Sequence, residues 1–395
     1  MTLIRPYSLL ISFIIACLYA TNLQASNGWS GSIGTEFQAY RHAAPFDQQH
    51  QYYRSIILKP EYVDEWNDGK HLIQFSAFAR LSNNNSNQNH MDIRELYWSY
   101  VSDMWELRTG IRKVFWGVTE SQHLVDIINQ TDIVEGFDGE EKIGQPMINV
   151  ASIHDWGTLD FFLLPSFQPR RYPSNDARLR PPFLISNDNA TYDASLEKKH
   201  IDVALRYSHY LGDWDFGVSH FYGNSREPRI SAPTFTPHYD LIHQTGVDIQ
   251  ATFETWLWKF EGIQRSGMGD RYFATTFGAE YTFFDLFESG ADIGIVSEWL
   301  YDSRGDSATT AFENDTMIAM RIALNDTQSS EALFGVIFDN EGDGNIATLE
   351  ASRRLGESFK ASINGYLFFS ANSLNEPLHF LQKDDHLTLE IFYFF

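Results

Sequence analysis

The chain has 395 residues, and its 52 acidic residues outnumber its 29 basic residues, which gives a formal net charge of -23 at pH 7. A charge of this sign argues against nucleic acid as a partner, because the phosphate backbone would repel it. Aromatic residues make up 15% of the sequence, although the mean hydropathy is only -0.31. This combination fits a membrane barrel, whose strands are apolar on one face only.

The amino terminus predicts a secretory signal peptide. Arg5 precedes an apolar run from Tyr7 to Ala20, and small and polar residues follow, as in a segment that is removed on export. The run is too short for a membrane-spanning helix. We expect cleavage after Ala25, so that residues 1–25 are the signal peptide and residues 26–395 form the mature domain.

Cys17 is the only cysteine in the sequence. The run Ile14-Ile15-Ala16-Cys17 resembles a lipoprotein cleavage box, so lipidation of Cys17 is the alternative to its removal with the signal peptide. Removal leaves a mature chain without cysteine. An exported chain of this length would then hold its fold through backbone pairing and burial rather than through disulfides.

Segments in which apolar and polar residues alternate recur along the mature chain, as expected for strands with one apolar face. In one of them, Phe273, Phe277 and Tyr281 alternate with Thr276 and Glu280. Each segment is long enough to cross an outer membrane when it is tilted. The predicted strands lie at about 29–40, 52–62, 70–81, 92–102, 105–116, 146–154, 158–165, 199–210, 214–223, 244–254, 256–265, 272–284, 289–301, 315–324, 330–339, 346–355, 359–370 and 386–395.

The connections between these strands alternate between short and long. Short turns on one side and long loops on the other are typical of outer-membrane barrels, whereas a soluble sandwich or propeller does not need them. We therefore predict an all-β protein, a transmembrane antiparallel up-and-down β-barrel of about 18 strands, with 16 as the alternative count. Its expected location is the outer membrane of a Gram-negative cell. Short connections lie at 103, 155–157, 212–213, 255, 285–288, 326–327 and 356–357, and long ones at 82–91, 117–145, 166–198, 224–243, 302–314 and 371–385.

Aromatic residues mark the ends of the predicted strands. Five of them flank short turns, as in the girdle of a membrane interface: Trp105, Trp156, Trp214, Trp256 and Phe287. The last strand ends on an aromatic residue, where a soluble domain usually frays. This strand resembles the closing strand of bacterial outer-membrane barrels, which the assembly machinery reads. The expected assembly signal is Leu389, Ile391, Tyr393 and Phe395. The resemblance implies the barrel assembly machinery, outer-membrane lipid and lipopolysaccharide as partners.

A Gly-x-Arg at Gly110 to Arg112, the pair Trp116-Gly117 and the spacing Asp126-x-x-Asn129-x-x-Asp132 follow one another in the first third of the chain. Over residues 94–132 and 349–395 the chain resembles a porin-like family of proteobacterial outer-membrane β-barrels of unassigned function. Two departures are Gln130, where the family usually has Pro, and the shorter chain. The resemblance implies a barrel and transport, and it names no substrate.

The inward faces of the predicted strands carry two groups of charge. The predicted pore-lining residues are Glu106, Arg108, Arg112, Arg206, Asp248, Glu280, Asp292 and Glu298; Arg321, Arg354, Lys360 and Glu254 extend the two groups. Opposed acidic and basic rows across a wet lumen would create a transverse field that sorts solutes by charge. The alternative is the polar interior that any wide barrel has.

The long connection at 117–145 is unusually apolar for an external loop. Leu124, Ile127 and Ile128 fall at helical spacing, which predicts an amphipathic helix within 120–128. We expect this segment to fold into the lumen as a constriction loop. It would bring Asp126, Asn129, Asp132 and Asp138 toward Arg108 and Arg112. A helix packed on the other external loops is the alternative.

Three further patterns point to binding or catalysis. Asp339, Glu341, Asp343 and Glu350 nearly match a calcium loop, but the flanks read as strands, so no metal or cofactor is predicted. His220 with Ser225 only loosely resembles the His and Ser of outer-membrane hydrolases, so no enzyme is predicted. Four arginines of the 166–198 loop either bind anionic groups such as lipopolysaccharide phosphates or order the loop: Arg170, Arg171, Arg178 and Arg180.

The function predicted from the sequence is a channel for passive diffusion of small solutes, because barrels of roughly 16 to 18 strands enclose an aqueous lumen. A plugged barrel that moves hydrophobic compounds or lipids with periplasmic partners is one alternative. A structural or adhesive outer-membrane protein is the other. The sequence specifies neither the solute nor the oligomeric state.

Overall fold

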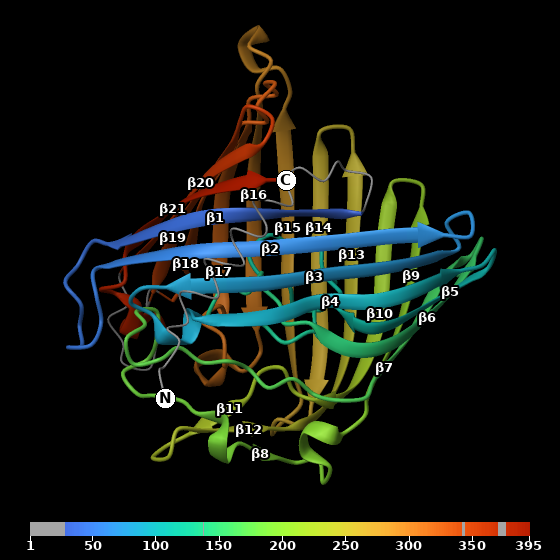
Figure 1. Cartoon of the computed structure of the whole chain (residues 1–395), viewed down its shortest axis with the longest axis horizontal. Coiled ribbons are helices and arrows are strands. Elements are labelled where there is room, and N and C mark those ends of the chain that lie inside the picture. Colours follow the sequence, from blue (N-terminus) through green and yellow to red (C-terminus); the bar gives the residue numbers. More distant parts are fainter. Residues whose placement is uncertain (1–27, 137, 342–343, 370–376) are drawn as a thin grey trace, which may run out of the picture.

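The computed structural model describes residues 28–136, 138–341, 344–369 and 377–395. Within these residues, 18 antiparallel strands form one sheet, and the last strand pairs with the first, so that the sheet closes into a barrel (Figure 1). The predicted all-β barrel and its 18 strands are confirmed. The predicted signal peptide at 1–25, with Cys17, lies outside the described residues.

The barrel strands match the predicted segments to within a few residues at each end. They are β1 (Trp29–Tyr40), β2 (Tyr52–Trp66), β3 (His71–Ser82), β4 (His90–Val101), β5 (Trp105–Arg112), β6 (Gln145–His154), β7 (Gly157–Leu164), β9 (Asp202–Leu211), β10 (Trp214–Asn224), β13 (Leu241–Phe253), β14 (Trp256–Ser266), β15 (Tyr272–Phe283), β16 (Asp292–Asp302), β17 (Asn314–Ala323), β18 (Glu331–Asp339), β19 (Asn345–Leu355), β20 (Phe359–Phe369) and β21 (His386–Phe394). In the part of the chain that the structure describes, six short 3-10 helices lie between them, at Ser86–Gln88, Asn187–Asn189, Glu197–Lys199, Leu286–Glu288, Gly305–Ser307 and Pro377–Leu381.

The terminal strand closes the barrel. β21 pairs with β1 from Ser32 opposite Phe394 to Tyr40 opposite His386, and the backbone N–H and C=O of Phe395 bond to those of Gly31 at 3.1 Å each. Closure leaves neither β1 nor β21 with the unpaired edge that would otherwise invite aggregation.

The two faces of each strand differ in the way the alternation predicts. On β15, Phe273 and Phe277 are exposed on the outside of the barrel, whereas Thr276 and Glu280 are buried inside it. The predicted girdle residues are all exposed on the outside next to short turns: Trp105, Trp156, Trp214, Trp256 and Phe287. No helix among the described residues combines the length and the apolar composition needed to cross a membrane.

Short turns lie at one end of the barrel and most long connections at the other. β1 begins and β21 ends at the short-turn end. A separate three-stranded sheet stands at the long-loop end (Figure 1). It consists of β8 (Thr191–Tyr192), β11 (Arg229–Ser231) and β12 (Thr236–Tyr239), and it joins the connection after β7 to the connection after β10.

Arg178 ties three long connections together. Its side chain is fully buried. Its Nε donates to Asp384 at 2.6 Å, and its Nη1 donates to the carbonyls of His42 and His50 at 3.3 Å each. A buried guanidinium needs such a full set of partners. Arg178 therefore orders the loops and is not free for an external anion.

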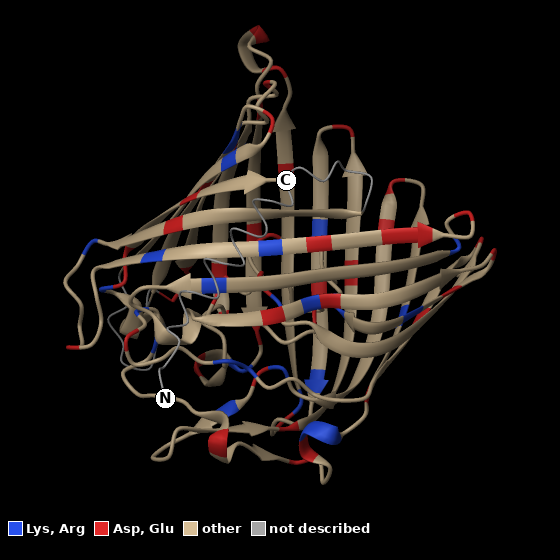
Figure 2. Cartoon of the chain, in the orientation of Figure 1, with Lys and Arg blue, Asp and Glu red and all other residues tan. Residues whose placement is uncertain are grey.

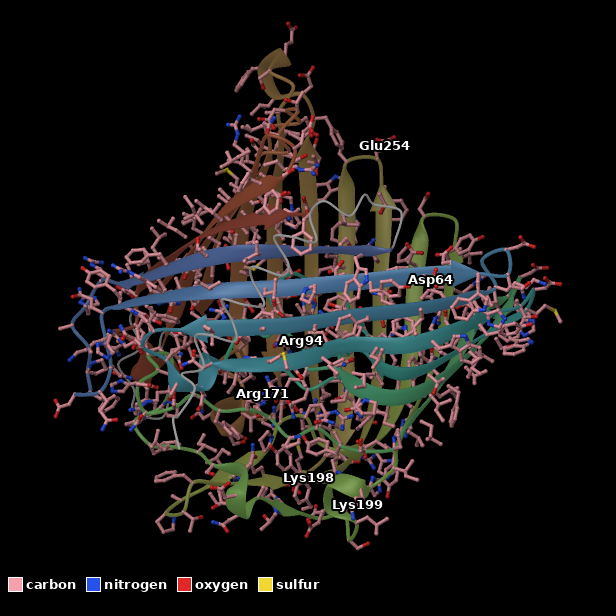
Figure 3. All side chains as sticks on the ribbon, in the orientation of Figure 1. Asp64, Arg94, Arg171, Lys198, Lys199 and Glu254 are labelled. Atoms are coloured by element: carbon pink, nitrogen blue, oxygen red, sulfur yellow. The ribbon has the colours of Figure 1, made fainter. Side chains whose placement is uncertain are left out.

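The other three loop arginines also have partners within the protein. Arg171 pairs with Asp92 at 3.2 Å and with Asp132 at 3.5 Å, and Figure 3 shows it close to Arg94 of the wall. Arg170 donates to the side chain of Gln130 and to a backbone carbonyl. Arg180 donates to two backbone carbonyls. These contacts agree with the loop-ordering alternative.

Candidate functional site

The connection between β5 and β6, residues 113–144, runs through the inside of the barrel, and we call it the inner loop. Two wall carboxylates hold its backbone. Glu261 on β14 accepts from the N–H of Val118 at 2.7 Å and of Thr119 at 3.0 Å. Glu298 on β16 accepts from the N–H groups of residues 120 and 121 at 2.7 and 2.8 Å. This placement agrees with the expected inward fold of the loop, whereas a role as a constriction remains a proposal.

Glu261 shows why the loop lies so close to the wall. Its side chain is fully buried, and it also accepts from the N–H of Val125 at 3.1 Å, so the backbone donors compensate the cost of burying a charge. Gly117 has a φ of +135, and a Cβ there would lie 2.8 Å from a Glu261 oxygen. Glycine permits both this backbone angle and this close approach, which explains the Trp116-Gly117 pair.

An apolar cluster fastens the other side of the inner loop. Trp116, Val125, Ile127 and Ile128 are buried against apolar residues that line the inside of β6, β7, β9, β10 and β13 to β15. The predicted helix at 120–128 is wrong, since no helix forms there. The backbone N–H groups bind wall carboxylates instead of the carbonyls four residues earlier, which a helix would require.

The Asp126-x-x-Asn129-x-x-Asp132 motif is buried inside the inner loop. Asp126 pairs with Lys142 at 3.0 Å. Asn129 accepts from the N–H of Val114 at 2.8 Å and donates to two backbone carbonyls. Asp132 pairs with Arg94 at 2.7 Å. The motif therefore positions the loop.

The predicted approach of the loop carboxylates to Arg108 and Arg112 is corrected by these contacts. Asp126 and Asp132 take the partners named above, and Asp138 accepts from the Tyr366 hydroxyl at 3.0 Å. Within the described residues, none of the three forms an ion pair with either arginine. Of the four predicted constriction residues, Asp138 is the one exposed to the lumen.

Acidic and basic residues both occur along the barrel strands (Figure 2), and members of the two expected rows pair with each other. Arg206 binds both oxygens of Asp248 at 2.7 Å. The pair lies over Gly217, where a Cβ would come within 2.3 Å of the guanidinium. Glu280 lies 3.6 Å from Arg321. Local neutralisation of this kind weakens a field across the lumen.

The remaining predicted pore residues lie on two other parts of the wall. Arg108 pairs with Glu106, and Arg108 and Arg112 share Asn149 at 3.2 and 3.1 Å. Asp292 stands at the short-turn rim, where it accepts from the N–H of Asp285 at 2.8 Å and from Asn325 at 2.9 Å. Asp292 therefore lies at the short-turn opening of the barrel rather than deep in the lumen.

The inner loop meets the inside of β17 to β20 at Arg321, which pairs with Glu120, and at Tyr366, which donates to Asp138. Toward the short-turn end, charged side chains there remain exposed: Arg321 is 40% exposed, Lys360 45% and Glu331 63%. Toward the long loops, the same wall turns apolar and borders a chamber of about 1060 Å³ between the wall, the inner loop and the long connections. This chamber was not predicted from the sequence. The predicted strand at 330–339 is apolar on both faces, and that pattern indicated an apolar surface on the inside of the wall.

No family model and no curated protein matches the sequence. Several solved structures do match the fold of the chain. Wzi of Escherichia coli aligns with a TM-score of 0.55 at 8% identity, over 96% of this chain and 87% of Wzi. OccK3 (OpdO) of Pseudomonas aeruginosa aligns with 0.53 at 9% identity, over 95% and 97%. A BenF-like porin of Pseudomonas fluorescens Pf-5 aligns with 0.54 at 8% identity, over 94% and 98%.

The chain has the porin-like fold of outer-membrane β-barrels. Wzi is described as an outer-membrane, carbohydrate-binding barrel involved in group 1 capsule assembly, and the Pseudomonas fluorescens protein is named as a porin. Identities this low establish the fold alone. The solute and the roles of single residues must come from this chain's own side chains.

In three further groups of polar residues, the members are either separated in the fold or already bound to other side chains. Ser225 is buried and donates to the carbonyl of Glu227, while His220 is on the outside and contacts Thr245, so they form no hydrolytic pair. Asp193, His238 and Asp240 lie close enough to hold a metal, but Arg229 already binds both oxygens of Asp240. Of the calcium candidates, Glu350 faces the lumen, Asp339 and Glu341 lie at the hairpin after β18, and Asp343 lies outside the described residues.

His123 joins the inner loop to the wall through two carboxylates. It lies 2.8 Å from Glu140 and 3.8 Å from Glu261. Burial by itself lowers the pKa of His123, but hydrogen bonds to these carboxylates outweigh it and raise the pKa to about 9. The protonated imidazole therefore helps to fix the loop.

We expect the stabilisation by His123 to depend on pH. Because the pKa is raised on folding from 6.5 to about 9, the contribution is complete below pH 6.5 and is lost as the pH rises through 9. The melting temperature of wild type minus that of His123→Gln should thus be large at pH 6 and small at pH 9.5. Exposed His154→Gln serves as control, and a difference for His123 that does not vary with pH would contradict the expectation.

Proposed function

We propose that the protein is an outer-membrane channel through which small solutes diffuse passively. The division of the lumen carries this proposal. The inner loop is held against the wall at β14 and β16, while charged side chains of β17 to β20 stay exposed on the other side. Exposed charge inside a barrel of this width means a hydrated path. Solutes would enter at the long-loop end, pass the chamber and leave along this wall.

The same proposal places the barrel in the Gram-negative outer membrane. Residues 1–25 act as the signal peptide, and residues 26–395 form the barrel. The apolar outer face contacts lipid and lipopolysaccharide, and the short turns lie in the periplasm, where both ends of the chain then belong. Leu389, Ile391, Tyr393 and Phe395 present their side chains on the outer face of β21, where the assembly machinery would read them.

A barrel that moves amphipathic compounds is the second candidate function, because the chamber wall is apolar. Planar-bilayer recording of the purified protein separates the two. A diffusion channel gives stable open steps, whereas a barrel that its loops close completely gives none. Stepwise conductance of heat-modifiable, correctly inserted protein supports the channel, and its absence contradicts it.

We expect Arg108→Glu combined with Arg112→Glu to shift the reversal potential in a salt gradient toward cation preference by several millivolts. Both arginines face the lumen and share the uncharged partner Asn149, so the exchange replaces two positive charges on the path by two negative ones. Arg41→Glu, on an exposed external loop, is the control. An unchanged reversal potential in the double variant would place these arginines away from the permeation path.

A further inference from the structure

The chamber beside β17 to β20 has an apolar wall, which the polar lumen of a diffusion barrel does not require. Met317, Leu333, Ile337 and Ile346 face it from four positions on three strands, and Phe312 and Leu381 cover it from the long connections. Its volume of about 1060 Å³ is at the upper end of the roughly 300 to 1,000 Å³ of pockets that enclose drug-sized ligands. An organic molecule of that size fits.

One side of the chamber is acidic. Asp138 and Glu140 project from the inner loop, and Glu350 projects from β19. Glu350 is exposed to the lumen and forms no hydrogen bond or ion pair with the described part of the chain. It lies within electrostatic reach of Asp138 and Glu140. His123, the one cation on this side among the described residues, pairs with Glu140. The three carboxylates of this side therefore outnumber its positive charge.

The other charges that border the chamber are already compensated. Glu120 pairs with Lys259 at 3.3 Å and with Arg321 at 2.8 Å. Arg170 and Arg180 donate to neutral acceptors within the loops. Their charges are opposed by Glu227 near Arg170 and by Asp384 and Asp176 near Arg180. The charge left without a partner in the chamber is therefore negative, and it stands next to an apolar surface.

Building on the proposed channel function, we propose that the chamber is a binding site for amphipathic organic cations, molecules with a protonated amine on an aliphatic or aromatic body. The body leaves water for the wall of β17 to β19, and the ammonium donates to the carboxylates of Asp138 and Glu350. An anion with the same body meets uncompensated negative charge and is rejected. A small hydrophilic cation gains from the carboxylates but not from the wall.

Current recording with three probes tests the site. The probes are 2-phenylethylammonium, the anion 3-phenylpropanoate with nearly the same body, and methylammonium. We expect 2-phenylethylammonium to interrupt the single-channel current about tenfold more often than either of the other two, because it alone has both the charge and the apolar body. Asp138→Asn with Glu350→Gln should reduce its interruptions by about tenfold, the effect of losing charge-assisted hydrogen bonds.

Two further variants separate charge at the site from charge elsewhere. Asp64→Asn with Glu254→Gln removes the same two charges near the short-turn end (Figure 3), and it should leave the interruptions intact. Leu333→Gln with Ile337→Gln keeps the acidic side but makes the wall polar. In that variant 2-phenylethylammonium should behave like methylammonium.

The possible outcomes distinguish the site from the channel. Equal interruption by the cation and the anion, or a response to the control pair as large as to Asp138→Asn with Glu350→Gln, overturns the binding site and leaves the channel standing. Absence of open steps overturns the channel. Calorimetric titration of the folded protein with the same probes then decides the site: heat from 2-phenylethylammonium and none from 3-phenylpropanoate supports it, and the reverse or equal heats overturn it.

Discussion

A barrel in which residues 119–143 are replaced by a short Gly/Ser linker should conduct severalfold more current per channel than the native protein. The inner loop crosses the lumen from β5 to β16, where Glu261 and Glu298 hold its backbone. We propose that the inner loop forms the narrowest part of the path, so its removal returns that space to water and widens the path. Single-channel recording measures the change, and heat-modifiable migration verifies insertion.

Point variants that keep the loop but weaken its anchors are the matched control. Glu261→Gln with Glu298→Gln retains the volume of the inner loop and removes the charge from two sets of hydrogen bonds. This variant should show a noisy current around the native level rather than a larger stable step. If the deletion inserts normally and conducts like the native barrel, the inner loop does not limit the current.

Deletion of Phe395, or its replacement by Asp, should strongly reduce the amount of protein inserted in the membrane while the signal peptide is still cleaved. Phe395 closes the seam with β1 through two backbone bonds to Gly31, and its side chain continues the outward row of Leu389, Ile391 and Tyr393. An Asp there would place a charge on the lipid side of the barrel, where it is costly. Fractionation with heat-modifiable electrophoresis measures the inserted fraction.

Phe394→Asp is the control for this prediction, since Phe394 precedes Phe395 on the opposite face of the same strand and pairs with Ser32. It should insert far better than Phe395→Asp. Equal insertion of the two variants would mean that loss of any terminal aromatic residue matters and that the outward position does not.

Local periodicity was sufficient to predict the barrel wall. A strand turns successive side chains to opposite faces, so a segment such as 273–283 reveals both its strand and its two surroundings without knowledge of its neighbours. The order of the strands followed from the short turns, and closure followed from the terminal row ending at Phe395. The apolar character of residues 124–128 also indicated correctly that this stretch needs a surface to cover.

The arrangement of the inner loop and of the side chains in the lumen depends on contacts between residues far apart in the chain. Alternation tells on which side of the wall a residue lies, but not what faces it across the barrel. The expected helix at 120–128 does not form, because backbone N–H groups at the start of this segment donate to Glu261, which lies 142 residues beyond Thr119 in the chain. Asp132 pairs with Arg94 rather than Arg108 because the fold of the inner loop sets which arginine it meets. The chamber exists for the same reason: four strands, one inner loop and several connections enclose it together, and none of them does so alone.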